Sequence, residues 1–302
     1  MLALLKITAF LLGHLPLAIT ALLGRVLGCL VYRLDRKHRN IAKENLRRAF
    51  GDKSEKDIER ITKKVFQNLA TTFLEFMRIP WLTAKGLDGC VKCDGMENLQ
   101  GALKKGKGVI LFTAHLGNWE LMAAYYGLKG FPIDVVAREL DSPALEAFVK
   151  WTRERSGNRI VSKSRAMRKL LRTLASNGIA GILLDQNVAL AEGVFVDFFG
   201  APACTNKGPA LVAAVSGAAA VPTFILREGE KHRIIIDKEV ELINTGNREG
   251  DAVENTARMT KVIEDVVRRH PEQWFWLHRR WKTRPPTDGN TPIGYAARGY
   301  QP

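Results

Sequence analysis

The sequence predicts an α/β protein with a largely parallel mixed sheet flanked by helices, preceded by a membrane-associated N-terminal helix. From about residue 90, short apolar runs alternate with amphipathic stretches, which is the pattern of strands joined by helices. The chain has 302 residues and is 46% hydrophobic, enough for a sizeable core. Residues 1–32 form a nearly uninterrupted apolar run, which predicts the N-terminal helix.

The apolar run at residues 1–32 predicts attachment to a membrane. It exceeds the roughly 20 residues of a spanning helix, although Pro16 and Arg25 interrupt it. It is also too long for the apolar part of a cleaved signal peptide. Lys and Arg side chains cluster at 33–39, and this positive charge favours the cytoplasmic side for the rest of the chain. A helix that lies in the interface without spanning is the alternative.

We therefore expect an anchor helix at residues 1–35 and one cytoplasmic-facing domain at residues 36–302. The domain begins with a helix over 37–50 and a second helix that starts near Ser54 and ends before Pro80. No internal repeat or linker divides the remainder. After residue 90, strands are expected at 109–114, 133–137, 179–184, 219–226 and 233–236, and helices at 119–128, 143–155, 165–176, 207–216 and 253–269.

Charge and cysteine content narrow the possible functions. The formal net charge of +15 favours an acidic partner: an anionic membrane, an acidic protein or nucleic acid. The sequence contains no nucleic-acid-binding motif of the usual kinds. Cys90 and Cys93 have metal-like spacing but lack the second pair that a tetrahedral zinc site needs. We expect them to be small residues of a strand, with no metal or cofactor.

His115 and Glu120 follow the strand expected at 109–114. On one regular helix, residues five positions apart point in different directions, so these two side chains cannot cooperate from a helix. Instead Leu116 and Gly117 turn the chain, and Asn118 caps a helix whose first turn holds Glu120. His115 then lies at the carboxyl end of a strand, where open α/β sheets bind ligands. There it is a candidate general base, with a carboxylate on its other nitrogen and helix N–H groups for an oxyanion. A purely structural role for both residues is the other interpretation.

The stretch His115-Leu-Gly-Asn-Trp-Glu120 resembles the His-x4-Glu motif of the bacterial lipid A biosynthesis acyltransferases of the late, lauroyl/myristoyl type. This family is distantly related to the His-x4-Asp glycerolipid acyltransferases. Blocks at 193–205, 217–222 and 276–285 are similar to family blocks in the same order, so the resemblance covers nearly the whole chain. It implies a glycerolipid acyltransferase-like fold. It also implies direct transfer of an acyl group from acyl carrier protein to a hydroxyl of a lipid A precursor, with His115 as base and Glu120 beside it.

The resemblance implies two further site residues. The stretch Trp151-Thr-Arg-Glu-Arg-Ser-Gly157 matches the family segment that carries a functional arginine; Arg153 is the better positional match and Arg155 the alternative. A guanidinium there would hold a phosphate or carboxylate bidentately. Asp185 follows the strand expected at 179–184, matches a family Asp and would orient the acceptor or Arg153. An exposed helix end and an ordinary loop-starting Asp are the structural alternatives.

Two aromatic segments have two interpretations each. Residues 194–199 line an acyl-chain pocket or belong to the core. Trp274, Trp276 and Trp281 alternate with basic residues and either contact lipid headgroups or pack inward.

The expected partners are an acyl-acyl carrier protein donor, a lipid A precursor acceptor and the membrane, without nucleic acid. The expected location is the cytoplasmic side of the bacterial inner membrane. The alternatives are transfer to another glycolipid or phospholipid, or a non-enzymatic basic protein that binds membrane or nucleic acid.

Overall fold

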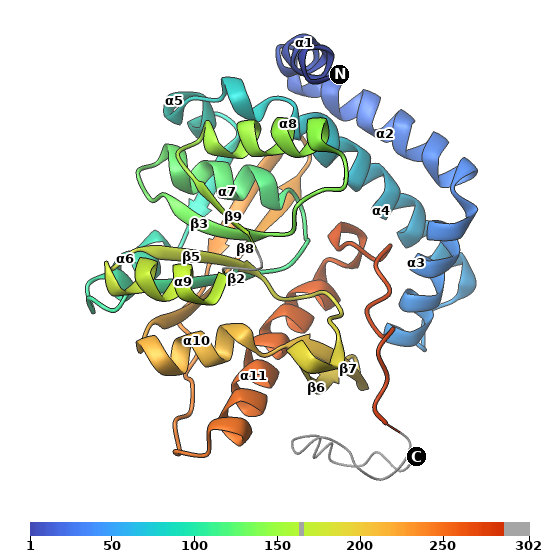
Figure 1. The fold of residues 1–302 in the computed structure, drawn as a ribbon. Coiled ribbons are helices and arrows are strands. Elements are labelled where there is room, and N and C mark those ends of the chain that lie inside the picture. The colour runs from blue at the N-terminus through green and yellow to red at the C-terminus, as the bar shows by residue number, and fades with distance from the viewer. Residues whose placement is uncertain (163–165, 287–302) are drawn as a thin grey trace.

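The computed structural model describes residues 1–162 and 166–286 and contains a seven-stranded mixed sheet of order β1-β9-β8-β2-β5-β3-β4 (Figure 1). Neighbouring strands run parallel except β8 and β9, which pair antiparallel. The sheet is therefore largely parallel, as predicted. The strands are β1 (Val91–Asp94), β2 (Val109–Thr113), β3 (Ile133–Ala137), β4 (Arg159–Ser162), β5 (Ile179–Leu183), β8 (Ala219–Glu228) and β9 (Lys231–Ile236), and a separate antiparallel hairpin joins β6 (Gly193–Phe198) to β7 (Ala201–Asn206).

Helices cover both faces of the sheet, because alternate residues of its buried strands point to opposite sides. Val109 and Leu111 of β2 face α5 (Ala84–Asp88), α6 (Met96–Leu103) and α7 (Trp119–Leu128). Ile110 and Phe112 face the other side, which α9 (Ala166–Ala175), α10 (Gly208–Ser216) and α11 (Arg248–Arg269) cover. α8 (Pro143–Glu154) lies against α7 (Figure 1). This doubly covered sheet confirms the α/β prediction.

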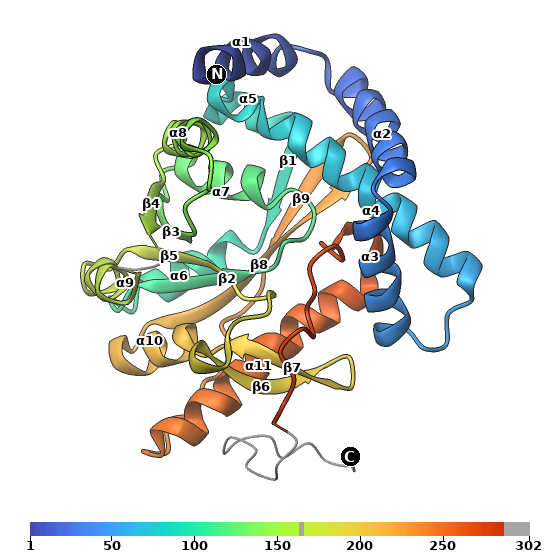
Figure 2. The same ribbon diagram turned by 45° about the vertical axis from the view of Figure 1, so that its right-hand side comes forward.

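The N-terminal apolar run forms two helices, so the expectation of one continuous helix is wrong. α1 spans Leu2–Gly13 and α2 spans Leu17–Leu34. The chain breaks before Pro16, because proline lacks the N–H that a continuing helix requires. α2 then packs along α4 (Glu55–Phe76), as Figure 2 shows. A Cβ atom at Gly24 or Gly28 would lie 2.6 Å or 2.4 Å from an α4 backbone Cα, so only glycine permits this approach.

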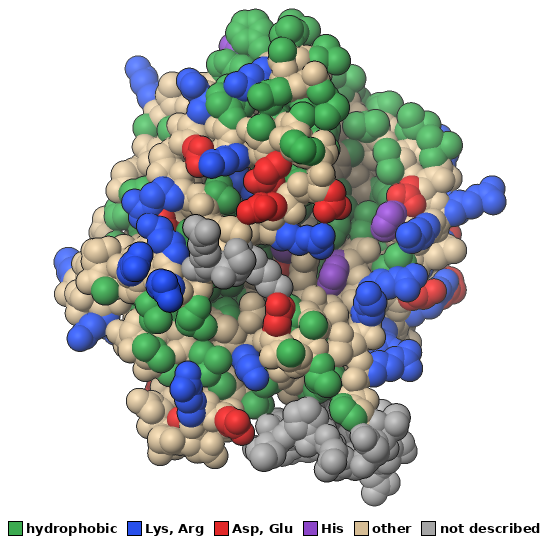
Figure 3. Space-filling view, viewed as in Figure 1, with side chains coloured by type: hydrophobic (Ala, Val, Ile, Leu, Met, Phe, Trp, Pro, Cys, Tyr) green, Lys and Arg blue, Asp and Glu red, His purple; other side chains and the backbone are tan. Residues whose placement is uncertain are grey.

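The opposite side of α2 is apolar and exposed, and the exposed face of α1 is similar. Figure 3 shows hydrophobic side chains gathered at the top and upper right of the molecule, where α1 and α2 lie. They include Leu4, Ile7, Phe10 and Leu11 of α1, and Leu22, Leu23, Val26, Leu27, Leu30 and Val31 of α2. Among the described residues, α2 is the one helix long and apolar enough to cross a membrane, judged by length and composition.

Most of the remaining predicted elements are present. α3 (Arg36–Ala49) and α4 match their expected positions, and the Ser54 hydroxyl caps α4 by accepting the Asp57 N–H. α11 begins five residues before the expected start at 253, because Asn247 caps it there. Cys93 lies in β1, as expected, whereas Cys90 lies in the turn just before it, so the strand prediction holds for Cys93 alone. β4, α6 and the separate β6–β7 hairpin were not predicted. Arg165, the expected start of one helix, lies outside the described residues.

Candidate active site

His115 and Asp185 extend two neighbouring parallel strands beyond their carboxyl ends. Thr113 of β2 lies opposite Leu183 of β5, so the residues two positions further along each chain also meet. Oδ1 of Asp185 lies 2.8 Å from Nδ1 of His115, and Oδ2 accepts the His115 backbone N–H at 2.8 Å. The Asp185 side chain is buried, whereas the His115 side chain is 18% exposed. Sheet register therefore assembles the pair.

The Asp185 carboxylate is ionised. Burial alone would raise its pKa, but the contacts with His115 and the Trp274 N–H outweigh burial and lower the pKa. Nε1 of Trp274 donates to Oδ2 of Asp185 at 2.7 Å. An ionised Asp185 accepts a hydrogen bond from Nδ1 of His115, which leaves the lone pair on Nε2. This tautomer suits a general base.

A tight turn directs the chain from β2 into α7. Gly117 has a φ of +61°, and a Cβ there would lie 2.0 Å from the Ile225 carbonyl oxygen, so the turn requires glycine. The Asn118 side chain accepts the Leu121 N–H at 3.0 Å and caps α7, as predicted. Glu120 therefore lies in the first turn of α7, where unpaired amide groups and the helix dipole favour negative charge.

Glu120 contacts Arg153 rather than His115, so the expectation of a direct His115–Glu120 contact is wrong. Nε and Nη2 of Arg153 donate to the two Glu120 carboxylate oxygens at 3.0 Å and 2.6 Å. Burial would lower the Arg153 pKa, but the negative charge and hydrogen bonds of Glu120 outweigh burial and raise the pKa. Arg153 was expected to hold a phosphate or carboxylate bidentately, and the carboxylate that it holds in the structure is that of Glu120. Asp185 takes the place beside the imidazole that Glu120 was expected to occupy.

Arg155, the alternative arginine, lies elsewhere. Its Nε donates to the Pro80 carbonyl oxygen at 3.1 Å, and its guanidinium lies over the Trp151 ring. Arg155 therefore ties the end of α8 to the residues that follow α4. Arg153 is the arginine that reaches the neighbourhood of His115.

The three C-terminal tryptophans pack inward, so the interpretation that they contact lipid headgroups is wrong. Trp274, Trp276 and Trp281 are at most 6% exposed and belong to one core cluster. Arg280 is fully buried as well: it donates to the Cys204 carbonyl oxygen at 3.0 Å. Burial lowers the Arg280 pKa to about 10. This segment forms part of the wall behind Asp185.

A cavity of about 970 Å³ opens beside His115, near the upper end of the usual range for ligand pockets. His115, Glu120 and Arg153 line it, together with apolar side chains from both neighbouring helices and strands. The apolar lining includes Leu69, Phe73, Phe76, Leu111, Met122, Ile133, Val135, Val149, Met167, Leu170 and Leu183. The site therefore combines a small polar cluster with a large surface suited to a hydrocarbon chain.

The aromatic run at 194–199 does not line this cavity. Phe198 and Phe199 are buried in the core with Trp274 and Trp276, so the core interpretation holds for these residues. The cavity-lining residues of α4 were missed, because a helix face that lines a cavity shows the same apolar periodicity as one that packs on a core.

Residues 2–283 match the model of the family described as bacterial lipid A biosynthesis acyltransferase. The chain is 27% identical over 277 residues to the lipid A biosynthesis lauroyltransferase of Escherichia coli (strain K12), covering 90% of this chain and 88% of that protein. It is 26% identical over 216 residues to the phosphatidylinositol mannoside acyltransferase of Mycobacterium tuberculosis (strain CDC 1551 / Oshkosh), covering 68% and 66%. The crystal structure of a 1-acyl-sn-glycerophosphate acyltransferase from Thermotoga maritima covers 86% of this chain and 100% of that chain, with 14% identity and a TM-score of 0.39. The family match spans every described helix and strand, and the chain belongs to the bacterial lipid A biosynthesis acyltransferase family.

Proposed function

We propose that this acyltransferase moves a fatty acyl group from acyl carrier protein to a hydroxyl of a lipid A precursor. The observation that carries the proposal is the His115–Asp185 pair at a cavity of about 970 Å³ lined mainly by apolar side chains. The base lies where an acyl chain can be held, and the family supplies the reaction class. The expected C12/C14-type donor remains a proposal, consistent with the lauroyltransferase relative.

In the proposed mechanism, Nε2 of His115 removes the proton from the acceptor hydroxyl as its oxygen attacks the thioester carbonyl. The tetrahedral oxyanion then collapses and expels the carrier-protein thiolate, which takes the proton from the imidazolium. Asp185 stabilises that imidazolium and keeps the ring oriented. No acyl-enzyme is formed.

Glu120 and Arg153 form a polar wall beside this base. Because they form a bidentate pair, their charges offset each other and neither cation nor anion is left alone in the cavity. We assign them to binding and orienting the polar end of the substrates. Amide groups in the first turn of α7 are available to stabilise the oxyanion.

A second candidate acceptor is a glycolipid other than a lipid A precursor. The relative that is named a phosphatidylinositol mannoside acyltransferase favours it, because that name refers to a different glycolipid. Both candidates need the same base and the same apolar cavity, so the acceptor must be identified by experiment.

We further propose that α1 and α2 attach the protein to the cytoplasmic side of the inner membrane by lying in the interface. α2 has an outward apolar face, while its glycine stripe is bound to α4. The glycine stripe packs on the part of α4 around Gln67 and Thr71, and Gln67 and Asn68 there are polar. A spanning α2 would carry this part of α4 into the hydrocarbon, which is costly for polar groups. The interfacial arrangement avoids that cost.

The direct test uses detergent-solubilised protein with lauroyl- and myristoyl-acyl carrier protein. The acceptors are a Kdo-bearing tetra-acylated lipid A precursor and a mannosylated phosphatidylinositol, and mass spectrometry reads the products. An acyl mass on the first acceptor that disappears with His115→Ala supports the proposal. The same mass on the second acceptor alone would identify the alternative. Thioester loss that does not depend on His115 would reject the assigned base.

A further inference from the structure

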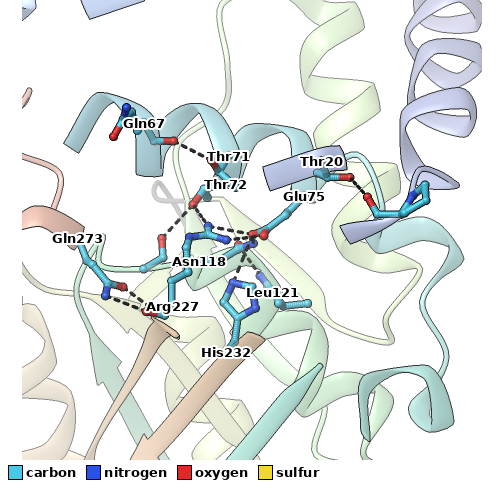
Figure 4. Close-up of polar contacts among 12 residues, drawn as sticks. Thr20, Gln67, Thr71, Thr72, Glu75, Asn118, Leu121, Arg227, His232 and Gln273 are labelled. Atoms are coloured by element: carbon cyan, nitrogen blue, oxygen red, sulfur yellow. Dashed lines mark hydrogen bonds and ion pairs between the residues drawn. The ribbon is translucent and has the colours of Figure 1, made fainter. Parts of the chain in front are cut away.

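A buried polar network surrounds Asn118, which lies in the turn between His115 and Glu120 (Figure 4). Glu75 of α4 and Arg227 of β8 form a bidentate pair, with side chains only 7% and 10% exposed. Nε2 of His232, on β9, lies 3.3 Å from Oε2 of Glu75. The proposed mechanism uses none of these three groups. A buried ion pair of this kind is costly to form, so its position calls for an explanation.

The network reaches the turn through Asn118. Oε2 of Glu75 accepts a hydrogen bond from Nδ2 of Asn118 at 2.7 Å. With its amide nitrogen held in this way, Asn118 directs Oδ1 toward the Leu121 N–H, which it accepts at 3.0 Å. A side-chain amide can rotate by half a turn and exchange its donor and acceptor. The Glu75 carboxylate accepts only, so it selects the one orientation that caps α7.

Two further contacts fix the turn from other directions. The Thr72 hydroxyl, one turn before Glu75 on α4, donates to the Gly117 carbonyl oxygen and accepts from Arg227, each at 3.1 Å. The Gln273 side chain accepts the Arg227 backbone N–H and donates to the Arg227 backbone carbonyl oxygen. The backbone carbonyl oxygen of Gln273 accepts the Gly117 N–H at 3.0 Å. α4, β8 and the C-terminal segment therefore meet at residues 117 and 118.

The charge state of Glu75 agrees with this geometry. Burial would raise its pKa, but hydrogen bonds and the charges of His232 and Arg227 outweigh burial and lower the pKa to about 2. Glutamine has nearly the same shape as glutamate but offers one acceptor oxygen and one donor group. It cannot accept from Arg227 and Asn118 with both ends at once.

We propose that Glu75 is a positioning residue of the acyltransferase: its carboxylate sets the Asn118 amide, and this fixes the turn that determines how His115 and Glu120 are placed. The expected effect on kcat rests on the proposed function. The expected effect on the turn does not, because Glu75 holds the turn whether or not a substrate reacts.

The kinetic test compares Glu75→Gln with Glu264→Gln, a matched control. Glu264 lies on α11, is 2% exposed and accepts from the Phe199 N–H and Arg268, away from the turn. For Glu75→Gln we expect kcat to fall by roughly 10- to 100-fold, because small displacements of reacting groups have large effects on rate. The pH at half-maximal kcat should stay near wild type, because Asp185 still holds Nδ1 of His115 in this variant. Equal losses of kcat in both variants would overturn the proposal.

A milder pair of variants protects the test against misfolding. Thr72→Val removes the hydroxyl that bonds Gly117, and Thr72→Ser retains it. The valine variant should lose kcat in the same manner, and the serine variant should recover most of it. Wild-type kcat in the valine variant, or an equal loss of kcat in both variants, would contradict a positioning role for the network.

Hydrogen exchange separates this inference from the proposed function. In Glu75→Gln, amides 115–122 should exchange at least about tenfold faster than in wild type, while the β6–β7 hairpin is unchanged. Glu264→Gln should show no such increase at 115–122. If wild type transfers no acyl group to any acceptor tested, the proposed function fails, yet this exchange result still decides whether Glu75 holds the turn. Unchanged exchange at 115–122 would reject the inference.

Discussion

Nδ1 of His115 lies 2.8 Å from Oδ1 of Asp185, a residue 70 positions further along the chain. The contact exists because β2 and β5 are parallel neighbours whose registered ends carry the two residues. Parallel sheets bring the ends of several strands to one edge, which is where ligands bind in open α/β folds. Residues that are distant in sequence therefore meet at one site, and each can be substituted alone.

Asp185→Asn should lower kcat by roughly 10²- to 10⁴-fold while the fold persists. Asparagine can present its amide nitrogen to Nδ1 of His115, which favours the tautomer with the proton on Nε2. Initial rates at saturating substrate measure the effect, with circular dichroism as the check on folding. Wild-type kcat in a folded Asp185→Asn protein would show that the contact does not serve catalysis.

Arg153→Lys should lower kcat/KM by about tenfold or more, because lysine cannot reproduce the two parallel hydrogen bonds to Glu120. Arg155→Lys is the matched control: it lies two residues away, and its Nε bonds the Pro80 carbonyl oxygen. The control should retain nearly wild-type kcat/KM. Equal effects of the two substitutions would indicate a general contribution of α8 rather than a role at the cavity.

Gly181→Val should shift donor preference toward shorter acyl chains. Gly181 lies in β5 and lines the cavity, and a Cβ there would make ordinary contacts of 3.6 Å with Ile133 and Val135. Valine suits a strand, so β5 should form while part of the cavity is filled. Competition among decanoyl to palmitoyl donors, read by product mass, measures the shift. An unchanged ranking of donors would place the acyl chain elsewhere.

The pH dependence of stability should contain a component from Glu75. Its pKa is about 2 in the folded protein, below the ordinary value of 4.5, so the unfolded state binds more protons between these values. The stabilisation, on the order of 3 kcal/mol, is present above pH 4.5 and is lost as the pH falls toward 2. Denaturant unfolding between pH 6 and 3 should show a smaller loss in Glu75→Gln than in wild type. The same dependence of unfolding free energy on pH in both proteins would contradict a lowered Glu75 pKa in the folded state.

Val26→Lys with Leu30→Lys should weaken binding to zwitterionic vesicles without unfolding the protein, because both side chains are exposed on α2 and such vesicles do not attract the added charges. Gly28→Leu should instead destabilise the fold while the exposed apolar face of α2 keeps its composition. The leucine side chain would collide with the Gln67 backbone, so the melting temperature should fall by several degrees. Vesicle co-sedimentation and thermal melting measure the two effects. Full vesicle binding by the double lysine variant would exclude α2 as the attached surface.

Sequence periodicity located most strands and helices, because each buried strand or amphipathic helix carries its own pattern. It placed His115 and Asp185 each after a strand, but it did not show that they meet, since sheet order is not written in any local pattern. Glu120 was expected to contact His115 because of closeness in sequence. Its partner Arg153 comes from α8, which the fold brings against α7.

The C-terminal tryptophans show a different limit of sequence analysis. Aromatic residues interleaved with Arg and Lys are typical of a membrane interface, and this composition alone supports either interpretation. The segment packs inward because Arg280 has buried hydrogen-bond acceptors, a backbone carbonyl of β7 and the Thr205 hydroxyl.

The sequence did contain a sign that Glu75 is buried. Glu75 lies about four helical turns after Ile61 and therefore on the same buried face of α4.

The Trp274–Asp185 hydrogen bond makes the site around His115 depend on a segment that is synthesised late. Trp274 holds Asp185, and the Phe275 N–H donates to the His115 carbonyl oxygen at 3.0 Å. Ribosomes release the N-terminal part of a chain first. The apolar helices α1 and α2 thus emerge long before residues 274 and 275 are synthesised. On the proposed assignments, membrane attachment can begin before Asp185 has its Trp274 partner, and therefore before the site is complete.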